Sequence, residues 1–228
     1  MKTTKTLSST LAVALLAAVQ GGSTLASEPR PHYEVVVTNL TRGQQFTPIL
    51  LATHRPGVRL FSPGSPASSQ LSRLAEEGDI IPLGDRLRAD PRVLDVANST
   101  MLLDPGKSVS IRVRAGDGRN RLSLAAMLVP TNDGFIALND VAGPSGRASV
   151  SYLSVAYDAG SERNDESCAS IPGPFFAECG GPGGGGMPSG GEEGYVHVHA
   201  GIHGIADLDA ARRDWRNPVA RIVVRYVP

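Results

Sequence analysis

Short runs of β-branched residues, interrupted by turn residues about every ten positions, constrain the fold of this chain most strongly. Residues 33–39 read Tyr-Glu-Val-Val-Val-Thr-Asn, and residues 108–114 alternate between polar and apolar side chains. Alternation with a period of two is typical of a strand with one buried face. Further expected strands span residues 48–53, 121–129, 135–138, 148–156, 195–199 and 218–227, and the pattern is β with turn punctuation from Val93 onward. About eight short antiparallel strands predict an all-β sandwich.

Helical periodicity is limited to one short region. Residues 68–77 place Leu71, Leu74 and Ala75 on a single face, and Ser68 or Ser69 can cap the first turn. Gly78 is placed to end this helix, and residues 83–87 add at most one more turn. The sequence therefore predicts one short helix between strands, packed on a β-sandwich.

The first 26 residues have the features of an export signal. Lys2 and Lys5 precede an apolar run at residues 11–19, and the tripeptide ending at Ala26 fits a cleavage site. The apolar run is too short for a membrane span. We therefore expect a mature domain of residues 27–228 without a transmembrane segment, located in the periplasm, at the cell surface or outside the cell.

The charge balance excludes one class of partner. The chain has 22 basic and 22 acidic residues, and loss of Lys2 and Lys5 with the signal leaves a mature chain with a small negative charge. Such a chain has no overall basic field to attract nucleic acid. We therefore expect no nucleic-acid partner.

Residues 164–193 differ in composition from the rest of the chain. They are rich in Pro and Gly, include four consecutive glycines at 183–186, and contain both cysteines, Cys168 and Cys179. In an exported protein these cysteines predict a disulfide, and the absence of CxxC spacing argues against a thiolate metal site. We expect a flexible surface insertion tied by the Cys168–Cys179 disulfide.

Two acidic loops follow expected strands. Asp133 lies in residues 131–135, and Asp158 and Glu162 lie in residues 157–162. Carboxylates at the ends of neighbouring strands can converge, which would suit a calcium ion with its six to eight oxygen ligands or an acid–base pair. The competing interpretation is that the acids only shape turns. Spare oxygen donors nearby are Asn132, Asn164 and Asp165.

A group of histidines offers a second candidate site. His197 and His199 would face the same side of a strand, and His203 follows the turn at Gly201. Three histidines can bind zinc, and an open fourth position would permit hydrolysis. Their spacing matches no standard zinc signature, so histidines that are exposed or hydrogen-bonded beside a turn are the competing interpretation. No Gly-x-Ser-x-Gly elbow is present, and we predict no catalytic residue.

Several segments taken together resemble the spondin N-terminal domain, which is named for F-spondin and also occurs alone in secreted bacterial proteins. One is Met127-Leu-Val-Pro-Thr-Asn-Asp-Gly-Phe135, and another is Tyr157-Asp-Ala-Gly-Ser-Glu162. The remaining similar segments are residues 33–41, 48–54, 74–78 and 217–225. They occur in the order found in the family and cover nearly the whole mature chain. The sequence thus resembles a bacterial stand-alone member.

The resemblance implies an antiparallel β-sandwich similar to that of C2 domains, with calcium at one end. Carried onto this chain, the implied ligands are Asp133, Asp158 and Glu162. Glu162 stands where the better-known animal members have aspartate, which would shift the geometry of the site. The cysteine-bearing insertion is also unlike those members.

These observations lead to one principal expectation and two alternatives. We expect a non-catalytic, calcium-binding module for binding or adhesion, with an extracellular protein, a polysaccharide or lipid headgroups as partner. The first alternative is a zinc-dependent hydrolase that uses His197, His199 and His203. The second is a metal-free structural secreted domain.

Overall fold

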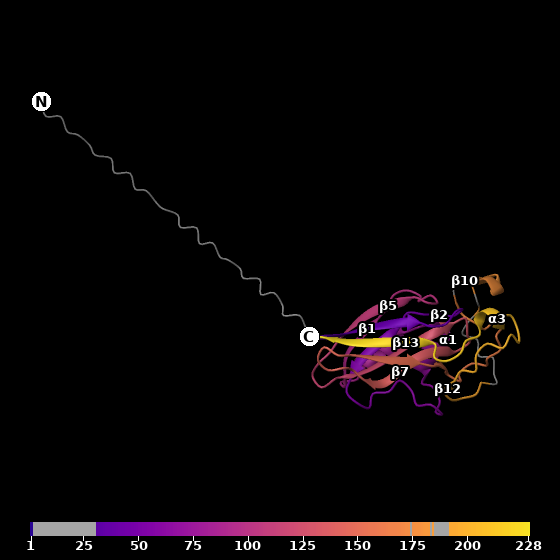
Figure 1. Cartoon of the computed structure of the whole chain (residues 1–228), viewed down its shortest axis with the longest axis horizontal. Helices are drawn as coiled ribbons and strands as arrows, with labels where there is room; N and C mark the ends of the chain where they lie inside the picture. The colour runs from indigo at the N-terminus through magenta and orange to yellow at the C-terminus, as the bar shows by residue number, and fades with distance from the viewer. Residues whose placement is uncertain (2–30, 174, 183, 185–191) are drawn as a thin grey trace.

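Two antiparallel sheets pack against each other in the computed structural model, and they confirm the predicted β-sandwich (Figure 1). The structure describes Met1 and residues 31–173, 175–182, 184 and 192–228. Apart from Met1, the expected export signal therefore lies outside the described residues. The four-stranded sheet has the order β5 (Ser108–Arg114), β1 (His32–Asn39), β13 (Ala220–Val227) and β8 (Ser149–Ser154). The other sheet has the order β12 (His197–Val198), β9 (Ala156–Asp158), β7 (Gly134–Ala142), β6 (Arg121–Val129), β3 (Leu50–His54) and β4 (Val93–Asn98), and β2 (Gln45–Phe46) also pairs with β6.

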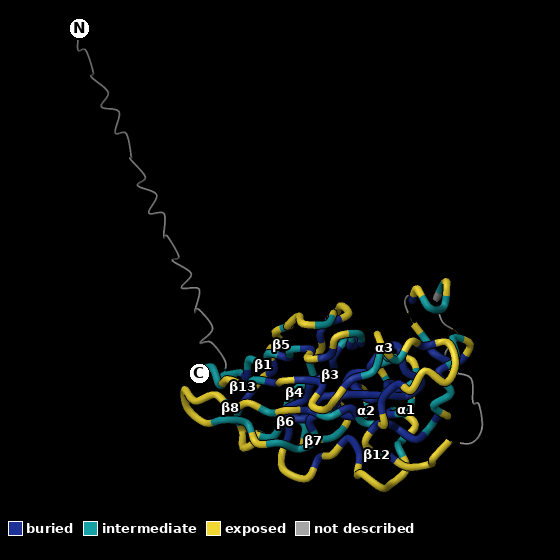
Figure 2. The backbone as a smooth tube through the Cα atoms, turned by 45° about the vertical axis from the view of Figure 1, so that its right-hand side comes forward, coloured by how far each residue is buried: buried dark blue, intermediate teal, exposed yellow. Residues whose placement is uncertain are grey.

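The main core lies between the two sheets, as the dark-blue strands of Figure 2 show. Strand β1 alternates between partly exposed and buried positions, with Val35 and Val37 fully buried. Ile222 and Val224 of β13 and Leu124 of β6 belong to the same apolar cluster. The alternation of polar and apolar residues in the sequence therefore indicates which face of each strand is directed toward the core.

Two helices cover the outer face of the larger sheet, where the sequence predicts only one. Helix α1 (Ser69–Glu77) begins at Ser68, whose hydroxyl accepts the N–H of Leu71, and ends at Gly78 with φ +69°. Helix α2 (Ile81–Ala89) runs for nine residues rather than one turn. It is held because Leu83 and Leu87 are buried in a second apolar cluster, which includes Leu71 and Leu74 of α1 and Ala125 and Phe135 of the sheet. No described helix is long and apolar enough to cross a membrane.

The β pattern expected from Val93 onward begins with β4, which pairs with β3, and Leu103 bridges back to Phe46. One expected strand is arranged differently. The expected strand at residues 148–156 is divided at Val155, with β8 in one sheet and β9 in the other. The chain therefore changes sheets just before Asp158, which brings that residue beside β7.

The Cys168–Cys179 disulfide is present, with a Cα–Cα distance of 5.4 Å. The expectation of a loose surface insertion is wrong for the part of residues 164–193 that the structure describes. Ile171 and Phe176 are buried in the main core, because apolar side chains within a Gly-rich stretch still gain from burial. The short strands β10 (Phe175–Phe176) and β11 (Gly181–Pro182) pair across the 3₁₀ turn η1 (Ala177–Cys179).

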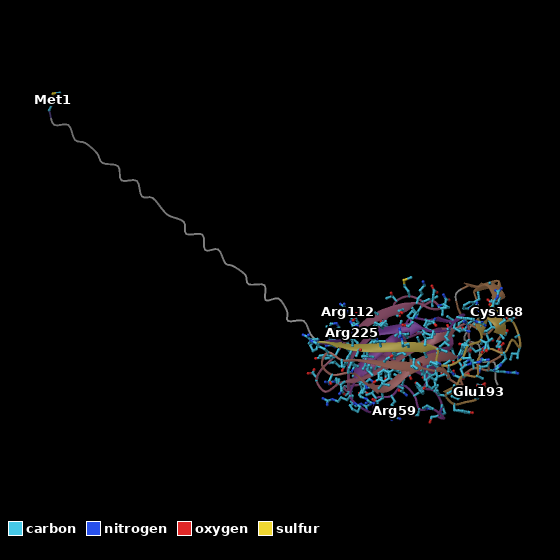
Figure 3. The ribbon with its side chains drawn as sticks, in the orientation of Figure 1. Met1, Arg59, Arg112, Cys168, Glu193 and Arg225 are labelled. Atoms are coloured by element: carbon cyan, nitrogen blue, oxygen red, sulfur yellow. A yellow bond between two sulfur atoms is a disulfide. The ribbon has the colours of Figure 1, made fainter. Side chains whose placement is uncertain are left out.

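A buried carboxylate fastens the insertion to the segment after β12. Glu166 accepts the N–H groups of His203, Gly204 and Ile205 at 2.6–2.9 Å. Farther along, Glu178 forms a two-pronged ion pair with Arg213 of α3 (Ala210–Arg213) at 2.8 and 2.9 Å. These contacts hold the insertion at the end of the sandwich that lies opposite the C-terminus (Figures 1 and 3).

Candidate metal centre

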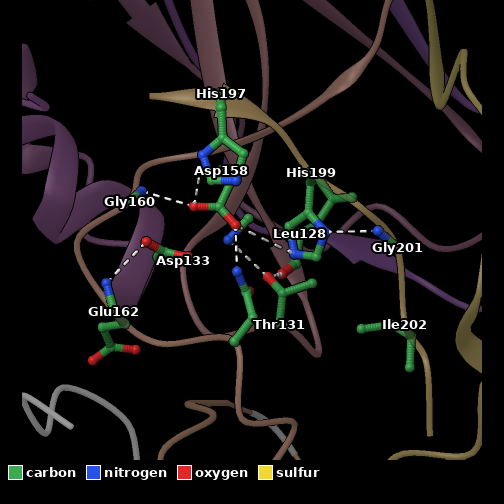
Figure 4. A network of polar contacts seen from close by, with 12 residues as sticks. Leu128, Thr131, Asp133, Asp158, Gly160, Glu162, His197, His199, Gly201 and Ile202 are labelled. Atoms are coloured by element: carbon green, nitrogen blue, oxygen red, sulfur yellow. Dashed lines mark hydrogen bonds and ion pairs between the residues drawn. The ribbon is translucent and has the colours of Figure 1, made fainter. Parts of the chain in front are cut away.

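The register of three neighbouring strands builds the centre of the site. Asp158, at the end of β9, pairs with Gly134 of β7 on one side and with His197 of β12 on the other. Residues directly opposite each other in antiparallel strands point to the same face, with Cβ atoms about 5 Å apart. Asp133, immediately before Gly134, is thereby brought next to Asp158 (Figure 4).

Asp133 lies fully buried in the turn between β6 and β7. Its Oδ2 atom accepts the N–H groups of Ser161 at 2.7 Å and of Glu162 at 3.0 Å. Its Oδ1 atom has no hydrogen-bond partner among the described residues. Burial, reinforced by the charge of Asp158, raises the pKa of Asp133 to about 7. This carboxylate is therefore poorly compensated in the absence of a cation.

Asp158 is also fully buried and is held by donors on both oxygens. Gly160 donates its N–H to Oδ1 at 2.7 Å, and the Asn164 amide donates to Oδ2 at 2.6 Å. The Nδ1 atom of His197 lies 3.7 Å from Oδ1, and the Nε2 atom of His199 lies 3.9 Å from Oδ2. Burial raises the pKa of Asp158 despite the two hydrogen bonds.

Glu162 is 3% exposed but does not converge side by side with the two aspartates. Figure 4 shows its backbone nitrogen facing Asp133 and its carboxylate pointing away. The Oε2 atom has no hydrogen-bond partner in the described part of the chain. Burial raises the pKa of Glu162 to about 8, and the charges of Glu76 and Asp133 add to that effect. The structure thus places all three predicted acids at one end, with Glu162 turned outward from the pair.

A different set of side chains is brought close together. One ligand atom each from Asp158, Glu193 and His197 lies within 4.8 Å of the other two, and among the described residues no other trio of His, Cys, Asp or Glu does so. Sequence reasoning missed Glu193, which lies just before β12 at the end of the Gly-rich stretch. The one feature of the sequence that could have identified Glu193 as a candidate ligand is the acidic pair Glu192–Glu193, which precedes the histidines at positions 197 and 199.

The three predicted histidines do not share one point within that distance. His199 is buried against Trp215, with ring centroids 5.0 Å apart, and burial lowers its pKa to about 4. Its Nδ1 atom accepts the N–H of Gly201 at 3.0 Å, so the neutral ring carries its hydrogen on Nε2. His203 is exposed. A zinc ion held by all three imidazoles is therefore not what this geometry favours.

The spare oxygen donors serve to fasten loops around the site. The amide of Asn132 donates to Asp165 at 3.0 Å and to the hydroxyl of Ser170 at 3.3 Å. Asp165 in turn accepts the Ser170 hydroxyl and the N–H of Ser167. Asn164 holds Asp158 directly, as described above. These contacts fix the loop that follows β9 against the β6–β7 turn.

Comparison with known proteins identifies the first part of the sandwich. The family model Spondin_N matches residues 32–143, which run from β1 to the loop after β7. Residues 32–143 therefore match a Spondin_N domain, which is a shorter segment than the nearly whole mature chain over which the sequence resemblance extends. The matched segment includes Asp133 but ends before Asp158, Glu162, Glu193 and the three histidines. A search of curated proteins found no match.

Proposed function

We propose, from the Spondin_N domain and the acidic end of the sandwich, that this chain is an exported calcium-binding module that acts by binding or adhesion rather than by catalysis. The observation that carries this proposal is that two buried oxygens, Asp133 Oδ1 and Glu162 Oε2, have no hydrogen-bond partner among the described residues. A buried ionised carboxylate is costly unless it is paired or coordinates a metal. A bound cation would offset that cost.

The donor set suits calcium. Asp133, Asp158 and Glu162 supply only oxygen ligands, and calcium binds oxygen with a flexible geometry of six to eight ligands. Three carboxylates provide three to about six of these oxygens, and backbone carbonyls or water would supply the rest. The outward side chain of Glu162 would have to turn toward Asp133 and Asp158, and its length allows a bidentate contact.

The location of the site supports a role in binding. Cys168 and Glu193 lie at the end of the molecule opposite the C-terminus (Figure 3), and Asp158 of the second acidic loop lies close to Glu193. A cation there would order the loops after β6 and β9 and present them to a partner. The partner would be an extracellular protein, a polysaccharide or lipid headgroups. The disulfide is consistent with an oxidising, extracytoplasmic compartment.

Calcium titration of the purified protein tests this proposal. We expect the melting temperature to rise with calcium and to return to its starting value in EDTA, while magnesium has a smaller effect. Calcium at a hundredfold excess over Kd would stabilise the folded state by about 2.7 kcal/mol. An unchanged melting temperature and no heat of calcium binding would leave a metal-free structural domain as the better description.

A further inference from the structure

We infer that Asp158, Glu193 and His197 form a second cation site, which selects a divalent transition metal such as zinc rather than calcium. The three side chains come from the end of β9, from the segment before β12 and from β12 itself. This site differs from the proposed calcium site, because Asp133 and Glu162 do not belong to the close trio. The two sites would share Asp158 alone.

The spacing of the ligand atoms is close to what a small cation needs. Zinc binds nitrogen and carboxylate oxygen at about 2.0–2.1 Å, so two ligand atoms of a tetrahedral site lie about 3.3 Å apart. In this structure one ligand atom each from Asp158, Glu193 and His197 lies within 4.8 Å of the other two. Small side-chain rotations would close the difference.

The ligand types decide the choice of metal. Imidazole with carboxylates suits zinc, copper and nickel, whereas calcium takes oxygen ligands. The Nδ1 atom of His197 also lies 3.2 Å from the carbonyl oxygen of Tyr195. In the neutral ring this contact places the hydrogen on Nδ1 and leaves a lone pair on Nε2. The neutral ring of His197 can therefore offer Nε2 as a nitrogen ligand.

A second, independent observation is the unpartnered nitrogen of His199. This ring is 4% exposed, and its Nε2 atom has no hydrogen-bond partner in the described residues. Because Nδ1 accepts from Gly201, Nε2 carries the hydrogen and is directed at Asp158 Oδ2, 3.9 Å away. Groups behind a metal ligand commonly orient the ligating carboxylate in this way. His199 would position Asp158 and would not bind the metal.

The burial of the trio provides both an anchor and an entry path. Asp158 is fully buried, His197 is half-buried and Glu193 is exposed. A metal can therefore reach the site from the side of Glu193, and water can complete the coordination shell.

Cobalt(II) and zinc titrations of protein without a polyhistidine tag test the inference. We expect one equivalent of Co²⁺ to give d–d absorption bands that zinc abolishes by displacement. The His197→Ala and Glu193→Gln variants should bind Co²⁺ about tenfold more weakly or worse. His203→Ala is the matched control, since it removes an exposed histidine nearby, and should bind as the wild type does.

The calcium response separates this inference from the proposed function. His197→Ala should keep the calcium-dependent rise in melting temperature, and Asp133→Asn should lose that rise but keep Co²⁺ binding. Asp158→Ala should lose both responses. Absence of stoichiometric Co²⁺ binding, or equal Co²⁺ affinity of the wild type and His197→Ala, would overturn the inference whatever the calcium result.

Discussion

The Oδ2 atom of Asp133 lies 3.0 Å from the backbone nitrogen of Glu162, and this contact joins the β6–β7 turn to the loop after β9. The Oδ2 atom thus holds the backbone N–H groups of Ser161 and Glu162 in place. The Oδ1 atom is buried and has no hydrogen-bond partner in the described residues. The same side chain therefore has a structural role in the metal-free protein and a free oxygen for a cation. Most of the predictions below depend on separating these two roles.

Asp133→Asn separates charge from hydrogen bonding. The amide oxygen can still accept the N–H groups of Ser161 and Glu162, but the negative charge is lost. We expect the variant to lose the calcium-dependent rise in melting temperature. In EDTA it should be at least as stable as the wild type, because an uncompensated buried charge has been removed. Calorimetric melts in calcium and in EDTA measure both effects.

Asp85→Asn is the matched control for this variant. Asp85 lies on α2 with 67% of its side chain exposed, and it pairs only with Arg88 among the described residues. The substitution changes the charge by the same amount, and we expect a change in stability within about 0.5 kcal/mol. Retention of the full calcium response in Asp133→Asn would refute the assignment of Asp133 as a ligand.

Metal-free protein should become less stable as the pH rises from about 4 to 8. Burial raises the pKa of Asp133 to about 7 and that of Glu162 to about 8 in the folded state. In this interval the folded chain binds more protons than the unfolded chain, so the free energy of unfolding falls with increasing pH. Urea unfolding in EDTA at several pH values measures the slope.

Calcium should weaken that dependence of stability on pH. Because calcium binds the ionised carboxylates, its binding releases protons and its affinity rises with pH. With saturating calcium, the stability should therefore decline much less between pH 5 and 8 than it does in EDTA. If the free energy of unfolding in EDTA instead rises between pH 5 and 8, burial does not raise the pKa of Asp133 and Glu162 in the folded protein.

Gly160→Ala should damage the site for two reasons. Gly160 has φ +65°, a left-handed conformation that costs alanine about 1–2 kcal/mol. An added Cβ would also lie 2.3 Å from the carbonyl oxygen of Tyr195. Since the Gly160 N–H holds Asp158, both stability and cation affinity should fall. Chemical unfolding and calcium titration of the variant measure the two losses.

Gly146→Ala isolates the conformational part of that effect. Gly146 has φ +62°, but a Cβ there meets no atom within 4 Å. Its loss of stability should therefore be the backbone cost alone, without change in calcium affinity. Equal stability losses for the two variants would show that the contact with Tyr195 is unimportant.

Ser123→Ala tests a buried network away from the cation sites. The Nδ1–H of His54 donates to the carbonyl of Arg55 at 2.8 Å, so Nε2 accepts the Ser123 hydroxyl at 2.9 Å. Ser123 also accepts the N–H of Asp140 at 2.9 Å. Removing the hydroxyl leaves the buried His54 ring and the half-buried Asp140 N–H without this partner, and we expect a loss of about 1–3 kcal/mol. Equilibrium unfolding in urea measures it, and calcium affinity should not change.

The same network predicts a weakening at acidic pH. Burial lowers the pKa of His54 below its ordinary value, so the unfolded chain takes up a proton first as the pH falls. Stability from this residue is complete above the unfolded pKa of about 6.5 and is lost as the pH falls below it. Comparing His54→Gln with the wild type at pH 7.5 and 5.0 in EDTA measures the contribution, which should be absent in the variant.

Local sequence patterns determined much of the architecture. The alternation in β1 and β5 and the apolar stripe of α1 predicted both the sandwich and the buried faces, because side-chain periodicity depends only on the backbone geometry of each segment. The nearby cysteines predicted the disulfide. The approach of Asp133 to Asp158 followed from turns placed at the ends of strands.

Only the tertiary structure decided which partners meet across the sheet. The change of sheets at Val155 sets the register in which Asp158 faces His197, and no local periodicity encodes that pairing. The same long-range packing brings Glu193 to Asp158, turns Glu162 outward and buries Ile171 of the insertion. Sequence thus determined the strands and the acids, and the cross-strand register determined which of those acids could share a cation.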